Sequence, residues 1–142
     1  MSTGVGTESE AQIAGETGER GTLRLTRMVN APVAHVWEVL VSPPGAAALL
    51  GEGAVLGAKG DPYHCTNGSS GVLRSYHPLE QLRVSYHPTP GSAPSIIEVD
   101  LRGENSVTVI ELRHDRIVDD MQRESLQEHW NAALDALVAL AS

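Results

Sequence analysis

Two Ser-Tyr-His-Pro segments, residues 75–78 and 85–88, bring together side chains that could do chemistry. A tyrosine hydroxyl beside an imidazole can donate and accept hydrogen bonds, or transfer protons near neutral pH. The simpler interpretation is structural, because tyrosine favours β-strands and proline ends them. Tyr86 is the better candidate for a binding site, since Leu82, Val84 and Tyr86 share one face of the expected strand.

The adjacent His64 and Cys65, with the remaining histidines, raise the question of a metal or a thiol nucleophile. Zinc needs four convergent nitrogen or sulfur ligands, usually with tight local pairs. Neighbouring residues of a strand point to opposite faces, so His64 and Cys65 do not form such a pair, and no metal site is predicted. A Cys-His nucleophile would need an electropositive niche that nothing here fixes, and a buried structural thiol is commoner.

Composition and motif content exclude several classes of function. The chain has 142 residues, a formal net charge of −8 and a single lysine, Lys59, so it lacks the basic cluster that a nucleic-acid partner requires. No window approaches the ~18 apolar residues of a membrane span. No P-loop, dinucleotide-binding, serine-hydrolase or zinc-protease motif occurs, and no cofactor is predicted. The lone Cys65 and the absence of a secretory leader favour the cytoplasm.

The order of expected elements begins after a polar tail. Residues 1–21 carry almost no large apolar side chains and are expected to be disordered, which leaves one domain over residues 22–142. Alternation from Leu23 to Val29 predicts a strand, and apolar spacing from Val33 to Val41 predicts a helix that ends at Ser42-Pro43-Pro44. A second short helix is expected over 45–50.

The rest of the chain is expected to form strands and one long helix. Turn-forming residues separate the strands, so consecutive strands should be antiparallel neighbours. The final helix is expected to start near Asp119-Asp120 or at Ser125. The expected strands are 54–57, 63–66, 72–76, 82–87, 95–102 and 106–114, and the apolar stripe of the helix is Leu126, Trp130, Ala133, Leu134, Leu137 and Ala141. A helix this amphipathic must lie on the concave face of the sheet.

Several motifs, in this order and spacing, resemble the START/Bet v 1-like (SRPBCC) superfamily, in particular the branch similar to the C-terminal domain of the Hsp90 ATPase activator. The resemblance covers about residues 22–140. It rests on Ala31-Pro32 with Val36-Trp37-Glu38 and Leu40, Gly71-Val72-Leu73 leading to Pro78 and Leu82, Thr108 through His114, and His129-Trp130 before Ala133 through Leu137. It implies an α+β helix-grip fold, in which a curved antiparallel sheet wraps around the C-terminal helix and leaves an internal cavity.

The resemblance also sets the functional expectation, because family members bind lipids, sterols, aromatic polyketides or hormones. We therefore expect binding or carriage of an apolar small molecule between the sheet and the final helix. The residues expected to contact it are Val84, Tyr86, Ile97, Val99, Leu101, Thr108, Ile110, Leu112, His114, Trp130, Leu134 and Leu137. His114 is expected either at the rim of that cavity or at a strand end in solvent.

Two other functions remain open at this point. A cyclase- or dehydratase-like enzyme would use a cavity histidine or tyrosine as acid and base. A protein-interaction module, for example a chaperone-associated one, would work through its surface and would need no cavity. The sequence identifies no reaction, so carriage without catalysis is the favoured expectation. Where many relatives carry a tryptophan-rich segment, residues 45–51 are small, which predicts a roomier pocket or a looser lid.

Overall fold

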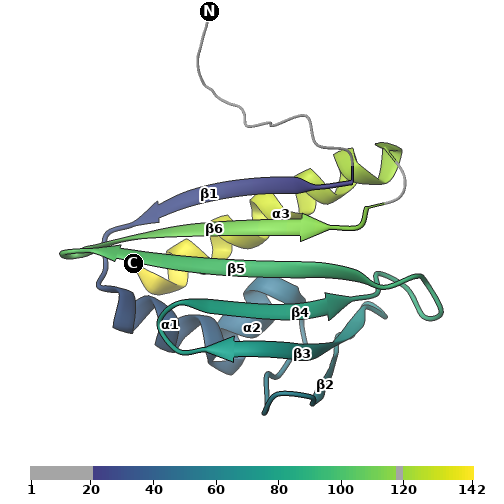
Figure 1. The fold of residues 1–142 in the computed structure, drawn as a ribbon, viewed down its shortest axis with the longest axis horizontal. Helices are drawn as coiled ribbons and strands as arrows, with labels where there is room; N and C mark the ends of the chain where they lie inside the picture. The colour runs from purple at the N-terminus through teal and green to yellow at the C-terminus, as the bar shows by residue number, and fades with distance from the viewer. Residues whose placement is uncertain (1–20, 118–119) are drawn as a thin grey trace, which may run out of the picture.

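The computed structural model describes residues 21–117 and 120–142, with side chains from 123 onward in the last helix. Three helices cover one face of a six-stranded sheet (Figure 1). The strands are β1 (Leu23–Val29), β2 (Pro62–His64), β3 (Ser70–His77), β4 (Gln81–Tyr86), β5 (Ser95–Glu104) and β6 (Val107–Asp115). The helices are α1 (Val33–Val41), α2 (Pro43–Leu50) and α3 (Asp120–Ala141). The tail predicted over 1–21 lies outside the described residues except for Gly21.

The sheet order is β1-β6-β5-β4-β3-β2, and every neighbouring pair is antiparallel. In Figure 1, α3 runs behind β1, β6 and β5, while α1 and α2 lie behind β4 and β3. This arrangement confirms the predicted α+β helix-grip fold. Along β4, β5 and β6 the residues that face the helices are buried, as the alternation predicts.

The strand predicted over residues 54–57 is wrong. Gly51 and Gly53 have φ values of 138° and 95°, which no strand uses, and the Ala54 amide bonds back to the Gly51 carbonyl at 3.1 Å. The segment is an irregular run that follows a turn, because Gly51 and Gly53, three and one positions before its start, let the chain reverse there.

Ser42 joins α1 to α2. Its amide bonds to the Val39 carbonyl at 3.2 Å and its hydroxyl accepts from the Gly45 amide at 3.2 Å, so one residue ends α1 and caps α2. Pro43 stands in the first turn of α2, where its missing N–H is tolerated, so α2 begins two residues before the predicted start. A Cβ on Gly45 would lie 1.7 Å from the Val39 carbonyl, so only glycine fits this corner.

Within the described residues no single helix is long and apolar enough to cross a membrane. The two short helices pass a length and composition test only as a pair, and they are bent by 77° at their junction.

The C-terminal helix supplies the inner wall of the core. Its predicted stripe is buried, with Trp130, Leu134, Leu137 and Ala141 all fully covered. Burial of each large apolar side chain contributes roughly 1.5–3 kcal/mol to stability. Arg27, which interrupts the alternation of β1, faces α3 and donates to Asn131 at 2.7 Å and to Asp135 at 3.0 Å. Asp135 is therefore an ion-pair partner rather than a purely solvated charge.

Candidate functional site

Three rings from three elements meet where β4, β6 and α3 come together. Tyr86, His114 and Trp130 contact one another edge to face, with ring centroids 5.5 to 5.8 Å apart. All three side chains are buried. We refer to these three residues as the aromatic cluster. Edge-to-face contacts of this kind favour a fixed relative orientation of the rings.

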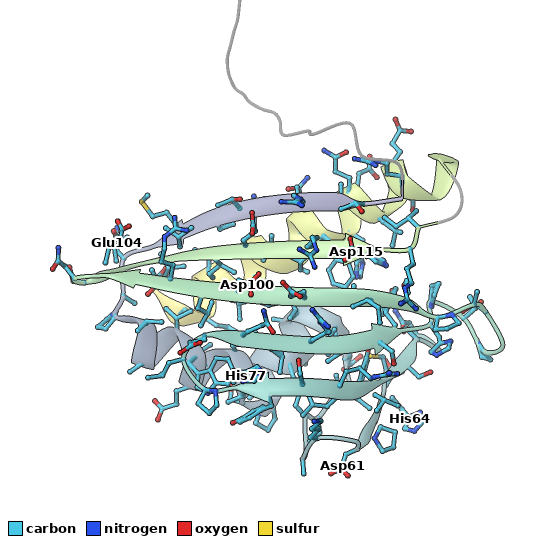
Figure 2. The ribbon with its side chains drawn as sticks, in the orientation of Figure 1. Asp61, His64, His77, Asp100, Glu104 and Asp115 are labelled. Carbon is cyan, nitrogen blue, oxygen red and sulfur yellow. The ribbon has the colours of Figure 1, made fainter. Side chains whose placement is uncertain are left out.

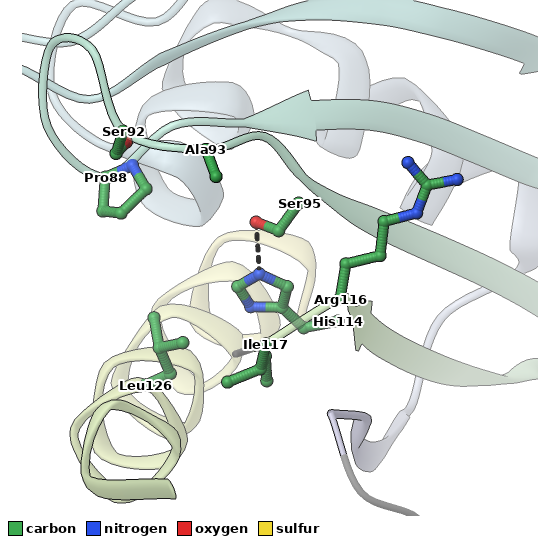
Figure 3. A pocket seen from close by; sticks show the side chains of 8 residues that line it. All are labelled: Pro88, Ser92, Ala93, Ser95, His114, Arg116, Ile117 and Leu126. Atoms are coloured by element: carbon green, nitrogen blue, oxygen red, sulfur yellow. Dashed lines mark hydrogen bonds between the residues drawn. The ribbon is translucent and has the colours of Figure 1, made fainter. Parts of the chain in front are cut away.

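A chain of hydrogen bonds fixes the protonation of the cluster. The Trp130 indole N–H donates to Nδ1 of His114 at 3.0 Å, so Nδ1 must be an acceptor. The proton of the neutral ring therefore sits on Nε2, which donates to the Ser95 hydroxyl at 2.7 Å (Figure 3). Ser95 in turn donates to the backbone carbonyl of Tyr86 at 3.0 Å. His114 thus lies buried in the middle of this chain, between Trp130 and Ser95, and not at a strand end in solvent.

Burial keeps this histidine neutral. Desolvation lowers the pKa of His114 to about 4, with nearby His129 acting in the same direction and Asp115 opposing it. Desolvation, followed by the influence of Cys65, raises the pKa of the Tyr86 phenol. At neutral pH the tyrosine holds its proton and both histidine nitrogens are occupied. The hydrogen bonds hold the aromatic cluster in one arrangement, and the cluster offers no free base.

A small pocket opens beside the cluster at the end of the sheet. Its volume is about 140 Å³, and one wall is formed by His114 and Ser95. Figure 3 shows Leu126 and Ile117 on one side, with residues of the β4–β5 connection opposite. The full lining is Pro88, Ser92, Ala93, Ser95, His114, Arg116, Ile117 and Leu126. Apolar walls with two or three polar groups are typical of small-molecule sites.

The residues predicted to contact a ligand gather on the inner face of the sheet and on the facing side of α3. All twelve are buried, with exposures of 8% or less. Ten of them pack into the hydrophobic core, whereas the hydroxyl of Thr108 donates to the Ala31 carbonyl at 2.8 Å. Tyr86 and Trp130 pack in that same core and also belong to the aromatic cluster, so of the twelve only His114 also lines the pocket described above.

The two Ser-Tyr-His-Pro segments separate in the structure. Tyr76 is 40% exposed and packs edge to face on Trp37 at 5.3 Å, away from the aromatic cluster. Imidazole Nδ1 of His87 bonds the Ser92 carbonyl at 2.8 Å and so holds the β4–β5 connection. The repeat therefore supplies one interior tyrosine and one exposed one.

The side chains of Cys65 and its neighbour His64 lie in different environments, as the alternation of a strand predicts. His64 is exposed, whereas Cys65 is buried and its thiol contacts the Leu50 carbonyl at 3.5 Å. Among the residues described here, no group of three or more histidine, cysteine or acidic side chains is arranged to hold a metal ion.

Sequence reasoning missed three residues near the cluster. Ser95 escaped notice because a serine at a strand start has no distinctive signal, and its role depends on His114, 19 positions away. Tyr63 is buried and donates to the Ser85 carbonyl at 2.8 Å. His129 packs edge to face on Trp130, with ring centroids 4.5 Å apart, and its Nε2 is buried without a hydrogen-bond partner in the described part of the chain. The His129-Trp130 pair in the family motif was the available signal.

Comparison with known proteins agrees with this geometry. The crystal structure of CalU16 from Micromonospora echinospora superposes with a TM-score of 0.70 at 23% identity, covering 85% of this chain and 76% of that one. The protein encoded by gene BPP1335 from Bordetella parapertussis gives 0.72 at 19% identity, covering 90% and 78%. DynU16, a protein in the dynemicin biosynthetic locus, gives 0.68 at 17%, covering 85% and 47%. These likenesses show a shared fold.

Among curated proteins, none matches this sequence. A family model does match, over residues 30–142, and its description is Activator of Hsp90 ATPase homolog 1-like protein. That match spans every element from α1 to α3. The chain therefore belongs to the Activator of Hsp90 ATPase homolog 1-like family, within the START/Bet v 1-like superfamily.

Proposed function

We propose that this protein binds a small apolar molecule, aromatic or lipid-like, between the sheet and α3. The observation that carries the proposal is the pocket beside the aromatic cluster, where apolar walls from Ile117 and Leu126 converge on the Ser95–His114 hydrogen bond. A ligand there would meet ring edges and a few polar groups. The lone cysteine makes the cytoplasm the expected place of action.

The volume of the pocket limits what can enter without a change of shape. Sites for drug-sized ligands span about 300–1,000 Å³, whereas this pocket holds about 140 Å³. One ring or a short acyl segment fits that space. A larger ligand would need the first turns of α3 to move away from the β4–β5 connection, exposing the twelve residues predicted from the sequence.

Carriage fits the site better than acid–base catalysis. A general acid or base works best with a pKa near the working pH and with a free position for the proton. His114 has a lowered pKa and both nitrogens in hydrogen bonds, and the raised pKa of Tyr86 keeps its phenol protonated. A protonated phenol can donate a hydrogen bond to a ligand without transferring a proton.

A fluorescence titration with the neutral probe N-phenyl-1-naphthylamine tests the proposal. We expect saturable binding with Kd in the micromolar range or tighter, about −8 kcal/mol. Leu126→Trp fills the pocket and should weaken binding at least tenfold. Leu140→Trp is the matched control, because Leu140 is 45% exposed on the same helix, and it should bind as the wild type does. No saturable binding, or equal binding by both variants, refutes the proposal.

A further inference from the structure

A second hollow, on the opposite face of the sheet, is lined by three arginines. Its volume is about 310 Å³, and its walls are Arg74, Ser75, Arg83, Ser85, Pro94, Ile96 and Arg116. Because Leu82, Val84 and Tyr86 face the helices, Arg83 and Ser85 between them must face outward. Figure 2 views this outer face, with Asp100 and Asp115 in front of the strands and the helices behind. We refer to it as the arginine hollow.

Two of the three arginines carry charge that no side chain among the described residues neutralises. Arg83 donates to Glu98 at 2.7 Å, and Arg113 shares that carboxylate at 3.3 Å. Burial acts to raise the pKa of Glu98, but the hydrogen bond from Arg83 leads the effects that outweigh it and lower the pKa, so this acid stays ionised. Arg74 and Arg116, in contrast, form no ion pair with any side chain in residues 21–117 or 123–142.

A β-bulge in β3 places the side chains of Arg74 and Ser75 in the hollow. The register between β3 and β4 shifts so that Leu73 faces Val84 but Ser75 faces Arg83, which leaves Arg74 as the extra residue. Bulges re-aim side chains and are common beside functional sites. Here the bulge brings two consecutive side chains, an arginine and a serine, to the same hollow.

The serine at the bulge has an unused hydroxyl. Ser75 Oγ is buried and makes no hydrogen bond within the described residues. Its neighbour in the hollow, Ser85, already accepts from the Val72 amide at 2.9 Å. A buried hydroxyl without a partner destabilises a protein, so such groups are rare and ask for an explanation. A ligand oxygen in the hollow would provide the missing partner.

Arg116 is held in a backbone conformation that favours glycine. Its φ is 68°, the left-handed region, while the next residue, Ile117, is buried and its amide bonds the Gly21 carbonyl at 2.9 Å. The turn itself needs no arginine, and glycine would adopt it at lower energy. Strained residues of this kind cluster at functional sites. In Figure 3 the Arg116 guanidinium extends away from Leu126 and the first pocket.

We propose that the arginine hollow binds a phosphate group, as free phosphate or as the phosphate monoester of a small molecule. Guanidinium groups form planar donor forks that match phosphate oxygens, and a serine hydroxyl adds a further donor. The net charge of −8 does not prevent this, because charges beyond about 8–10 Å are largely screened at physiological salt. The hollow lies on the other face of the sheet from the pocket beside the aromatic cluster, and Arg116 is the one residue that lines both.

Calorimetric and NMR titrations of the full chain with inorganic phosphate and with phenyl phosphate test this proposal and distinguish the two sources. Tighter binding of phenyl phosphate points to an ester, and equal binding points to free phosphate; both support the site. We expect saturable binding that weakens as salt is raised. Acetate serves as a carboxylate comparison, and binding of acetate as tight as that of phosphate overturns the proposal.

Variants locate the binding and separate it from folding. Arg74→Gln and Arg116→Gly should each weaken phosphate binding about tenfold, and Ser75→Ala about threefold. Arg116→Gly should also raise Tm by a few degrees, because glycine accepts the positive φ. Arg102→Gln is the matched control, since Arg102 is exposed on the same face but lies outside the hollow, and it should bind within twofold of wild type. Absence of saturable binding by the wild type, or unchanged binding by Arg74→Gln and Arg116→Gly, refutes the proposal.

Discussion

The two faces of the sheet differ in whether their buried polar groups find hydrogen-bond partners. On the inner face, His114, Ser95 and the Trp130 indole satisfy one another in a closed chain, and Thr108 bonds the Ala31 carbonyl. On the outer face, the hydroxyl of Ser75 has no hydrogen-bond partner in the described part of the chain, and Arg116 sits in a strained conformation. Polar groups of the inner face therefore hold the fold. In the arginine hollow, Ser75 and Arg116 instead cost stability, which is what the proposed phosphate site would explain.

The largest expected effect comes from removing the centre of the inner network. Trp130→Ala should lower the free energy of unfolding by about 3–5 kcal/mol, because it leaves a cavity and strips His114 of its donor. Trp130→Phe keeps most of the ring and should cost about 2 kcal/mol. On the outer face, Arg74→Ala should change stability by less than about 0.5 kcal/mol. Urea denaturation measures all three, and equal losses on the two faces would contradict the comparison.

The pH dependence of stability should come from the inner face. The pKa of His114 is lowered to about 4 in the folded state, against 6.5 when unfolded, so the unfolded chain binds the proton more tightly. Stability is therefore full above pH 6.5 and falls as pH drops from 6.5 to 4, by about 3 kcal/mol in total. The lowered pKa of His129 acts in the same sense.

Denaturation at several pH values checks this with two variants. His114→Gln should remove most of the slope between pH 6.5 and 4, whereas His129→Gln should keep most of it. A wild-type stability that does not change over this range would show that His114 is not buried as described.

The sequence predicts a structural feature well when residues close together in the chain determine that feature. The helix α3 and the strands β5 and β6 could be predicted from side-chain spacing, and the resemblance to a known family then implied the helix-grip arrangement. The irregular run over 54–57 could not, because the positive φ of Gly51 and Gly53 overrides an apolar pattern. The tail and Asp119 lie outside the described residues, so those expectations stay predictions.

The sites depend on pairings that no local pattern contains. The orientation of His114 was left open between cavity rim and solvent, since it is decided by Trp130, which lies 16 positions later. The bulge at Arg74 depends on how β3 registers against β4. Arginines spread over β3, β4 and the residue after β6 carry no spacing signal, so the arginine hollow emerges only from the folded chain.

A smaller loss of stability is expected when a buried, hydrogen-bonded hydroxyl is removed than when Trp130 is removed, and an exposed hydroxyl serves as the comparison. Thr108→Val should cost about 1–2 kcal/mol, because the Ala31 carbonyl loses its buried donor. Thr26→Val is the control, since Thr26 is exposed on the outer face of β1, and it should be neutral within about 0.5 kcal/mol. Thermal unfolding of the pair is sufficient, and similar Tm values for both variants would contradict the assignment.

The smallest expected effect on the free energy of unfolding is a gain rather than a loss. Ser75→Ala should raise stability by about 0.5–1 kcal/mol, because it removes a buried hydroxyl that forms no hydrogen bond with the described residues. Ser85→Ala is the matched control and should lower stability, since Ser85 accepts from the Val72 amide. Chemical denaturation measures both, and a loss of stability in Ser75→Ala would show that its hydroxyl is satisfied.

The central claim is that an apolar ligand contacts the aromatic cluster, and the two tryptophan indole N–H signals test it most directly. In an NMR titration with N-phenyl-1-naphthylamine, the Trp130 signal should shift and saturate, because its indole bonds His114 at the pocket wall. The Trp37 signal should stay in place, since Trp37 packs on Tyr76 elsewhere in the fold. An unmoved Trp130 signal at saturating probe would contradict the account.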